Sequence, residues 1–519
     1  MQEKPHDKDT GLLKTIDNRV FHIIPSFLKG RGFTDRKLTD TPTDDLQVVP
    51  KKYVDDNTLA SPLTTKGDIW GFSTLNARIP VGTNNQFLRA DSTQTLGVVW
   101  GSGSGAQSCT FVIGPSSNSD SAFYDYTTDG TDDDVQIQAA IDALPTAGGR
   151  IIFREGTYTI GTPVTVAKNG VTLQGQGQGT IIQAKALLDA SIFDIGHAST
   201  AYRDCKIRDF YFDGKKANNN TRNPLIDNVT LTTRMRNLEI SGCYFLNALG
   251  SCIGNAGENC IIQNNYFQDW DGASVGSTSE ASLYLATNEK VMNNYFTNID
   301  TTEKYITTGT SKAVIIGNEF QMPNSYNSAV ISSQTYIISD NFFNIGTSAG
   351  ASCVIIQDAR IVSGNTIYFD TTANVASVAI KNCNEVVDNE MDSMGVGIIW
   401  DTTGGGTIKG NKISLTKANG ITLSSAGAYI IGNIIRYGGS TDDTYTGISI
   451  AVAGTTIVSN NEISGNGTGG AKWKYGVRET AAANGPNIIT NNYFVSGSFV
   501  TAAISTQNTL TEIAHNITV

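Results

Sequence analysis

The sequence predicts an all-β chain, in which a right-handed single-stranded parallel β-helix over residues 109–519 follows a small β-rich N-terminal region. A short motif recurs every 22 to 31 residues, a period that suits one coil of a β-solenoid. Fixed motif positions carry a branched aliphatic residue and, with one exception, Phe, Ile or Met. With 39% hydrophobic and 16% charged residues, the composition excludes disorder, and no run of about 20 apolar residues suggests a membrane span.

The motif is a branched aliphatic residue, two variable residues, Asn, one variable residue, and then Phe, Ile or Met. The Asn positions are Asn265, Asn294, Asn318, Asn341, Asn365, Asn389, Asn411, Asn433, Asn461, Asn492 and Asn516, and Cys243 takes this place in an earlier copy. Asn tolerates the left-handed turn conformation better than most residues, so we expect each of these Asn to adopt it where a strand ends. Stacked coils would then align the Asn side chains in a ladder and the Ile and Phe side chains in apolar stacks.

A leucine-rich repeat is the rival structure at this period, but the Leu-dominated pattern it requires is absent. Twelve copies at roughly 4.8 Å per coil give a column of about 60 Å. Residues 150–153, 170–177 and 206–214 are candidates for earlier, less regular coils.

A short helix is expected where the β-helix begins, within residues 129–165. Thr131 or Asp132 can cap it, and the acidic residues suit its first turn. Its apolar side would consist of Val135, Ile137, Ile141 and Leu144. Such a helix would cover the open end of the solenoid, where unpaired strands invite edge association.

The segment 129–165, which contains DGTDDDVQIQAAIDALPTAGGRIIF, resembles the opening of the pectate-lyase-like β-helix superfamily, common in bacteriophage tailspikes. The stretch FDGKKANNNTR at 212–222 is similar to a segment often seen after the first coils of such proteins. The resemblance covers about residues 125–519. It implies the fold but says little about activity, because the family includes lyases, hydrolases, epimerases and plain binders.

The N-terminal part carries a second resemblance. VVPKKYVDDNT at 48–58 and the stretch 64–101 resemble short modules of phage tail fibres and other virion appendages. The alternative is that both are only small β-rich linkers. GSGSG at 101–105 is typical of a flexible linker. The expected organisation is a virion-attachment region at 1–60, a fibre-type module and linker at 61–108, and the β-helix at 109–519.

Charge and cysteine content limit the partners. The net charge of −11, without a Lys/Arg run, argues against nucleic acid. Seven cysteines without CxxC spacing and four scattered histidines predict reduced thiols and neither a metal nor another cofactor. The start MQEKPHDKDT has no apolar signal region, so we expect synthesis in the host cytoplasm and release within a virion.

Three long loops are candidate glycan-binding sites, because aromatic faces stack on sugar rings while acids bind hydroxyl groups. The candidate residues are Asp269, Trp270 and Asp271 in the first loop, Tyr437, Asp442, Asp443 and Tyr445 in the second, and Trp473 and Tyr475 in the third. The second and third loops belong to successive coils and should be neighbours. The alternatives are subunit contacts for the aromatic residues and solvated surface charges for the acids.

A candidate catalytic pair lies at strand ends. VIIQD ends at Asp358, VAIKN at Asn382 and GIIWD at Asp401. If these ends align, Asp358 and Asp401 lie two coils or roughly 10 Å apart, near the separation of inverting glycosidase carboxylates. A one-residue shift would turn a side chain to the other face. No GxSxG, HExxH or P-loop is present, and the acidic strings of the superfamily's active members are missing.

We therefore expect a virion spike or fibre that adsorbs to a host surface polysaccharide, contacts other virion proteins through its N-terminal region and forms a homotrimer. The alternatives are a polysaccharide depolymerase, either hydrolase or lyase, on the same β-helix and a purely structural decoration protein. The last coil reaches Val519, so we expect that another chain covers this end or that a C-terminal chaperone has been removed.

Overall fold

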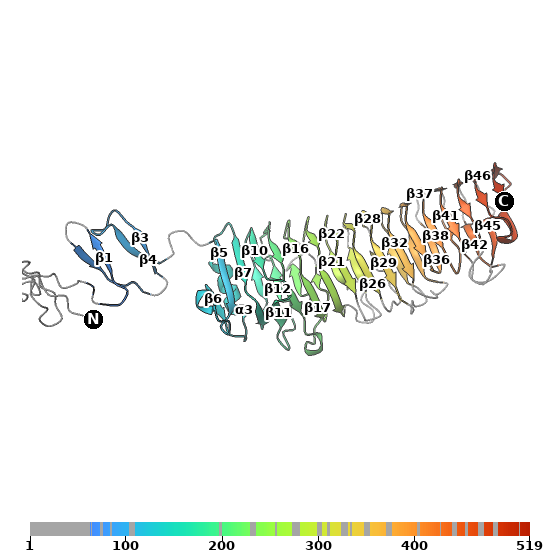
Figure 1. Cartoon of the computed structure of the whole chain (residues 1–519). Helices are drawn as coiled ribbons and strands as arrows, with labels where there is room; N and C mark the ends of the chain where they lie inside the picture. Colours follow the sequence, from blue (N-terminus) through green and yellow to red (C-terminus); the bar gives the residue numbers. More distant parts are fainter. Residues whose placement is uncertain are drawn as a thin grey trace, which may run out of the picture. The chain divides into compact units, whose positions relative to one another are not determined.

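The computed structural model describes the chain from residue 63 onward, with gaps (Figure 1). The described residues are 63, 65–72, 76–83, 86–102, 109–196, 200–228, 235–254, 257–271, 281–297, 304–308, 312–322, 331–332, 335–346, 353–369, 376–401, 405–425, 427–438, 444–451, 455–465, 472–480, 486–507 and 509–519. The chain divides into two compact units, residues 1–106 and 107–519. The expected attachment region, 1–60, lies outside the described residues.

The described part of the first unit contains two antiparallel ribbons. One pairs β1 (Ile69–Phe72) with β2 (Asn76–Ile79), and the other pairs β3 (Gln86–Ala90) with β4 (Val98–Ser102). The indole nitrogen of Trp100 donates to the Pro80 carbonyl at 2.6 Å, which joins the second ribbon to the segment after the first. Gly82 lies directly against this indole, because a Cβ there would be 2.8 Å from the ring.

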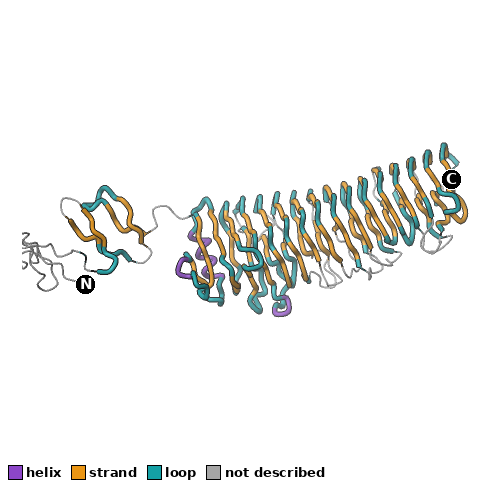
Figure 2. The backbone as a smooth tube through the Cα atoms, viewed as in Figure 1, coloured by secondary structure: helices purple, strands orange, loops and turns teal. Residues whose placement is uncertain are grey.

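The second unit is a parallel β-helix with three long sheets (Figures 1 and 2). Sheet 1 contains, in order, β6 (Tyr126–Thr128), β5 (Thr110–Pro115), β7 (Gly149–Phe153), β10 (Val171–Gln174), β13 (Lys206–Arg208), β16 (Glu239–Ser241), β19 (Ile261–Gln263), β22 (Lys290–Met292), β25 (Val314–Ile316), β28 (Ile337–Ser339), β31 (Ile361–Ser363), β34 (Glu385–Val387), β37 (Gly406–Lys409), β40 (Ala428–Ile431), β43 (Ile457–Ser459), β46 (Ile488–Thr490) and β49 (Glu512–Ala514).

Sheet 2 contains β8 (Gly156–Ile160), β11 (Thr180–Ala184), β14 (Tyr211–Asp213), β17 (Tyr244–Ala248), β20 (Tyr266–Trp270), β23 (Tyr295–Thr297), β26 (Glu319–Met322), β29 (Phe342–Ile345), β32 (Thr366–Phe369), β35 (Glu390–Asp392), β38 (Lys412–Ser414), β41 (Ile434–Arg436), β44 (Glu462–Ile463), β47 (Tyr493–Phe494) and β50 (Ile517–Thr518).

Sheet 3 contains β9 (Val164–Val166), β12 (Phe193–Ile195), β15 (Ile226–Asn228), β18 (Ile253–Gly254), β21 (Ala281–Leu285), β24 (Lys304–Thr308), β27 (Ile331–Ser332), β30 (Val354–Gln357), β33 (Val378–Lys381), β36 (Val396–Trp400), β39 (Ile421–Leu423), β42 (Thr446–Ile450), β45 (Trp473–Glu479) and β48 (Phe499–Ser505).

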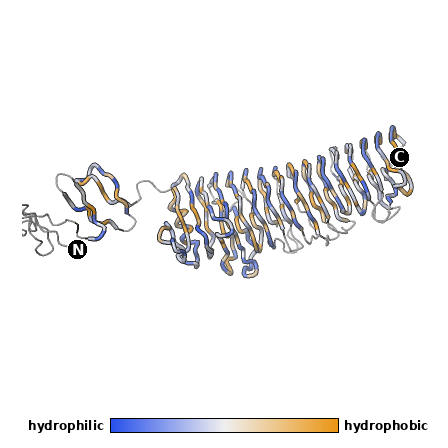
Figure 3. Tube along the Cα trace, viewed as in Figure 1, coloured by the Kyte–Doolittle hydropathy of each residue, from blue (hydrophilic) through white to orange (hydrophobic). Residues whose placement is uncertain are grey.

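Each full coil takes one strand from each sheet, and Figure 3 shows hydrophobic and hydrophilic residues alternating along the coils. Alternation places every second side chain in the core and the others in solvent. The predicted fold class, a right-handed parallel β-helix, is confirmed.

The asparagine ladder is confirmed from Asn265 to Asn516. At Asn389, Oδ1 accepts from the backbone N–H and the side-chain amide of Asn365, at 3.0 and 2.9 Å. Its own Nδ2 donates to Asn411 Oδ1 at 2.9 Å and to a carbonyl of the preceding coil. In the earlier copy, the Cys243 N–H donates to Asn265 Oδ1 at 2.9 Å.

The conformation expected for these asparagines is wrong by one residue. The left-handed φ belongs to the residue before each ladder Asn, for example Asn264 (56°), Asn293 (54°) and Asp388 (53°). Gly364 and Gly410 take the same place in other coils, with φ of 65° and 68°. From Asn265 to Asn492 the ladder Asn is instead buried, since its amide must turn inward to reach the backbone groups of neighbouring coils.

A stack of phenylalanines fills one side of the core along six successive coils. Its members are Phe212, Phe245, Phe267, Phe296, Phe320 and Phe343. Neighbouring ring centroids are 4.6–5.0 Å apart and their planes agree within 9°. Such aromatic pairs contribute about 0.5–1.5 kcal/mol beyond area burial.

The predicted helix is present as α3 (Asp134–Ala143), which contacts β5, β6, β8 and β9 at the first-coil end. Two details differ from expectation. The residue at the N-cap is Asp133, whose carboxylate accepts from the backbone N–H groups of Gly130 (2.8 Å) and Thr159 (2.7 Å) rather than capping the helix. Val135 is 62% exposed, and Ala140 takes its place in the buried face.

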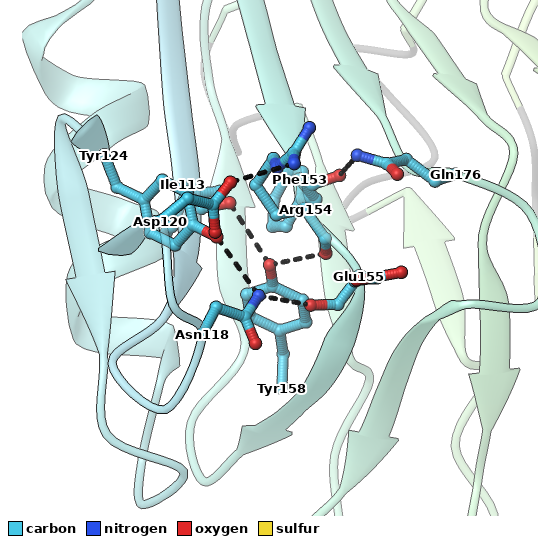
Figure 4. Close-up of polar contacts among 9 residues, drawn as sticks. All are labelled: Ile113, Asn118, Asp120, Tyr124, Phe153, Arg154, Glu155, Tyr158 and Gln176. Atoms are coloured by element: carbon cyan, nitrogen blue, oxygen red, sulfur yellow. Dashed lines mark hydrogen bonds and ion pairs between the residues drawn. The ribbon is translucent and has the colours of Figure 1, made fainter. Parts of the chain in front are cut away.

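Hydrogen bonds and an ion pair connect residues 116–125 to the first coil (Figure 4). This segment includes the short helix η2 (Ser121–Phe123). Arg154 pairs with Asp120 at 2.9 Å, and the Tyr124 hydroxyl donates to the same carboxylate. Asn118 donates to the Tyr124 hydroxyl at 3.1 Å and to the Glu155 carbonyl at 3.0 Å. The hydrogen bond from Tyr124 is the largest cause of the lowered pKa of Asp120, and the charge of Arg154 makes a smaller contribution in the same direction.

Candidate glycan-binding surface

The outer face of sheet 2 carries a row of tyrosines. Tyr211, Tyr244, Tyr266 and Tyr295 stand above one another because β14, β17, β20 and β23 pair in register. Successive ring centroids lie 6.4, 5.6 and 5.0 Å apart. Because the rings cover one another's faces and the side chains stand away from the sheet, the phenol hydroxyls form the outer edge of the row. Burial raises the pKa of Tyr211 and of Tyr295, so these hydroxyls stay protonated at neutral pH.

A second outward row runs beside the tyrosines, two residues further along each strand. It contains Asp213, Leu246, Gln268, Thr297, Gln321 and Asn344. Asn344 Nδ2 donates to Gln321 Oε1 at 2.8 Å, which aligns these two amides along the row. Phe342 extends the first row and Tyr368 the second, each with 39% of its surface exposed. Hydroxyl and amide groups beside exposed rings are the chemistry that holds a sugar chain.

Sequence reasoning missed this surface, although a pattern for it was present. The variable position between the motif Asn or Cys and the motif Phe is Tyr244, Tyr266 and Tyr295 in successive copies. When the same solvent-facing motif position is aromatic in successive coils, the stacking of the coils places those rings in a row.

In the first candidate loop, Trp270 was expected to stack on a sugar, and that expectation is wrong because the side chain is fully buried in the core. Asp269 pairs with Lys216 at 2.5 Å, and Asp271 pairs with Arg222 at 3.4 Å. Both cations belong to the segment around η3 (Lys216–Asn218), so the ion pairs join this segment to the strand end two coils away.

The strands that follow the second and third candidate loops are neighbours, because Thr446 pairs with Tyr475 in the register of β42 and β45. Trp473 is fully buried, so the expectation that it stacks on a sugar is also wrong. Its ring fills the space beside Gly438, where a Cβ would lie 1.8 Å from the indole. Asp442 and Asp443 lie outside the described residues.

Three tyrosines of these two loops keep outward-facing surface. Tyr437 is 47% exposed and has a φ of 56°, which is strained for a bulky residue. Tyr445 is partly buried against the core. The Arg478 guanidinium lies over the Tyr475 ring at 5.2 Å, so one face of that ring is covered.

The expected alignment of Asp358 with Asp401 is wrong by one residue. Gln357 pairs with Lys381, which places Asp358 level with Asn382. Lys381 in turn pairs with Ile399, so the residue level with Asn382 in the next coil is the buried Trp400, not Asp401. Asp358 and Asp401 therefore occupy different positions along the corner of their coils and are not stacked above one another.

Asp358 lines a shallow pocket of about 430 Å³ at the corner between sheets 3 and 1. The pocket also contains Tyr336 and Arg360, whose guanidinium lies 5.0 Å from the centre of the tyrosine ring. Gln357 Nε2 donates to the Asp358 carboxylate at 2.9 Å. Asp401 is exposed and accepts only a long hydrogen bond, of 3.5 Å, from Ser425 among the described residues.

A carboxylate pair that sequence reasoning missed lies on the outer face of sheet 3. Asp194 of β12 and Asp227 of β15 are direct partners in the parallel register. Burial, with a smaller contribution from the Asp194 charge, raises the pKa of Asp227 to about 6. Burial also raises the pKa of Asp194, against a hydrogen bond from Ser191. Adjacent carboxyls of which one holds a proton can serve as an acid and a base. The pattern was visible as Asp in the middle of the strands FDI and IDN.

Among the described residues, no group of three or more His, Cys, Asp and Glu side chains could hold a metal ion. Six of the seven cysteines are buried, and burial raises the pKa of Cys243 and Cys383 to about 12, so they remain neutral thiols. No described helix is long and apolar enough to cross a membrane.

Comparison with known proteins gives one family match and several structural ones. A family model described as "Periplasmic copper-binding protein (NosD)" matches residues 332–518, less than half of the chain. The described residues in that range include no group of three or more His, Cys, Asp and Glu side chains that could hold copper, and Cys353 and Cys383 are buried. No curated protein matches the chain.

Three solved structures illustrate the likeness. The tailspike protein of E. coli bacteriophage HK620 in complex with pentasaccharide has 16% identity and a TM-score of 0.45, covering 73% of this chain and 76% of that one. Tailspike protein 3 of bacteriophage CBA120 has 9% identity and a TM-score of 0.44, covering 86% and 70%. The A-module of the Azotobacter vinelandii mannuronan C-5 epimerase AlgE6 has 16% identity and a TM-score of 0.37, covering 75% and 96%. At these values the similarity carries no argument about binding or activity.

Proposed function

We propose that this chain is a virion spike or fibre protein that adsorbs to a host cell-surface glycan along the outer face of sheet 2. The observation that carries the proposal is the row Tyr211, Tyr244, Tyr266 and Tyr295 with the polar row beside it. A sugar chain lying along these rows meets phenol hydroxyls on one side and amides or hydroxyls on the other. Each contact repeats after one coil, so weak contacts add along the chain.

The loop residues extend this surface within the proposal. Tyr437 offers an exposed ring, Tyr445 directly precedes β42, and Tyr475 lies on β45. Asp442 and Asp443, between them in sequence, are proposed as hydroxyl acceptors. Asp269 and Asp271 have the same proposed role, and each would give up its ion pair, with Lys216 or Arg222, to bind a sugar hydroxyl.

The proposal includes the setting of the protein. Other virion proteins would bind residues 1–60, the chain would form a homotrimer, and it would be made in the host cytoplasm. A homotrimer presents three copies of the glycan surface, which raises avidity on a polymer without any new contact.

A polysaccharide depolymerase is the second candidate, and the Asp194–Asp227 pair favours it. Partners one coil apart have Cα atoms roughly 4.8 Å apart, compatible with the carboxyl spacing of retaining glycosidases. Asp358 and Asp401 remain a weaker catalytic proposal, since they are not level with each other.

The test is incubation of the purified full chain with a panel of bacterial surface polysaccharides. Binding would be followed directly, cleavage by new reducing ends, and lyase products by ultraviolet absorbance of unsaturated uronates. The double variant Tyr266→Ala/Tyr295→Ala should lose most of the binding. Phe123→Ala, which removes an aromatic ring that is 85% exposed on another surface, should not.

Three outcomes separate the candidates. Binding that needs Tyr266 and Tyr295, without products, supports adsorption. Product formation that disappears in Asp227→Asn supports the depolymerase. Binding equal in the double variant and the wild type overturns the sheet 2 surface, and no binding to any glycan favours a structural decoration protein.

A further inference from the structure

The outer face of sheet 1 is unusually apolar between β19 and β46. Two outward rows run along these ten strands, and eleven of their twenty positions are aliphatic or aromatic. The eleven residues, called here the apolar strip, are Ile261, Met292, Val314, Ile316, Ile337, Ile361, Val387, Tyr429, Ile431, Ile457 and Ile488. Ten are partly exposed, and Tyr429 is 48% exposed.

The outer face of sheet 2 in the same coils has a different composition. The charged residues of sheet 2 there are Glu319, Glu390, Asp392, Lys412, Arg436 and Glu462. Sheet 1 carries only Lys290, Glu385 and Lys409 at its outward positions in these coils. Sheets 1 and 2 belong to the same coils and have the same strand geometry. Because sheet 2 carries charged residues at its outward positions, the solenoid does not require apolar residues at those of sheet 1.

The size of the strip is that of a protein interface. Ten strands at roughly 4.8 Å span about 45 Å, and two rows with their side chains cover a width of roughly 13 Å, so the two rows together occupy on the order of 600 Å², of which the apolar strip provides about half. Exposed apolar patches of a few hundred Å² are often functional. Two such faces in contact, with their polar positions included, bury on the order of 1,200 Å², the lower limit of stable specific interfaces.

We infer that the apolar strip packs against the same strip of other copies of this chain, with the solenoid axes side by side and, in the proposed homotrimer, the three strips facing a common axis. A partner must offer a straight apolar surface of equal length, and the same strip on another copy does so. Both copies have the same rise per coil, so Ile and Val side chains of one can fit between those of the other along the whole strip. The few charges, two lysines and one glutamate, add little repulsion.

This inference rests on the homo-oligomer in the proposed function and names the surface that forms it. It leaves sheet 2 free, so the tyrosine row of each copy stays accessible to glycan. The oligomer and the glycan site can therefore be tested separately.

The experiment is measurement of the solution mass of the full chain by light scattering and sedimentation over a range of concentrations. The wild type should have a whole-number multiple of the chain mass. The double variant Ile316→Glu/Ile361→Glu, which places two carboxylates in the strip, should fall to the mass of one chain. Ile434→Glu makes the same change at an outward position of sheet 2 and should keep the wild-type mass.

Circular dichroism would establish that each variant is folded, and the single variant Ile361→Lys replaces the double variant if that one fails to fold. A single-chain mass for the wild type at all concentrations would overturn both the oligomer and the strip. A multiple mass that persists in the folded strip variants would overturn the strip alone. Glycan binding by each variant reports on the sheet 2 proposal independently of these results.

Discussion

Replacing one buried ladder asparagine should destabilise the β-helix strongly, and Asn389→Ala is the sharpest example. The Asn389 Nδ2 group donates to the Asn411 side chain at 2.9 Å and to the carbonyls of Val362 (2.9 Å) and Val387 (3.0 Å). Its Oδ1 accepts two hydrogen bonds from Asn365. Because Nδ2 has only two hydrogens, the residue makes about four full hydrogen bonds.

The magnitude follows from these bonds. At about 1 kcal/mol each, with an added cost for donors and acceptors left unpaired in the core, the loss in unfolding free energy is about 3–5 kcal/mol. Alanine also leaves the buried N–H of Asn365 without its acceptor. The exposed Asn384, in the same coil, provides the control, and its replacement by Ala should change stability by less than about 0.5 kcal/mol.

The assay combines urea unfolding with hydrogen exchange. A solenoid need not unfold in one step, so the global midpoint should be supported by local protection. Amide hydrogens of the peptide that contains Asn365 should exchange faster in Asn389→Ala than in the wild type. In Asn384→Ala their exchange rate should equal that of the wild type. Equal protection and an unfolding free energy within about 1 kcal/mol of the wild type would refute the account of the ladder.

Three further predictions concern packing and charge. Gly438→Ala should lower stability by about 1–3 kcal/mol, because the new Cβ would lie 1.8 Å from the Trp473 ring; an unchanged melting temperature would contradict this contact. Phe296→Ala should cost about 3–5 kcal/mol in urea unfolding, since it leaves a cavity within the phenylalanine stack, whereas a loss below about 1 kcal/mol would mean that the stack closes around the gap. The folded chain holds the Asp227 proton up to about pH 6, above the ordinary value of 3.8, so wild-type stability should fall as pH rises through this window. Asp227→Asn should therefore be more stable at pH 7 by about 1–2 kcal/mol, allowing for partial exposure, and the difference should vanish below about pH 4; equal stability at both pH values would mean that the pKa is not raised.

The repeat predicts the coils well because the same residues recur in the same environment. Asn365 and Ile367 are two residues apart in one motif, and the period alone places each above its equivalents. Local turn detail does not follow from the period. Asn264 rather than Asn265 takes the left-handed φ, because the ladder amide must face the core.

The candidate sites were harder to predict because loops and coil lengths vary. Trp270 is the last residue of β20, and the left-handed φ of Asp269 (56°) interrupts the in–out alternation before it, so the Trp270 ring enters the core. Asp401 is not level with Asp358 because β36 has five residues where β33 has four. Lys381, the last residue of β33, pairs with Ile399, so β36 continues for one more residue, Trp400, before Asp401. The Asp194–Asp227 pair depends on two strands of different coils, so neither residue identifies it alone.

The side-chain amides of the ladder all point in one direction. In each link, Nδ2 of one asparagine donates to Oδ1 of the next, from Asn265 through Asn492 to Asn516. Aligned amide dipoles polarise one another, which strengthens each bond by about 10–30%. A central member such as Asn389 gains from both neighbours, whereas Asn516 gains from one. The stability of a coil therefore depends on its distance from the ends of the row, and a gap in the middle weakens coils on both sides of it.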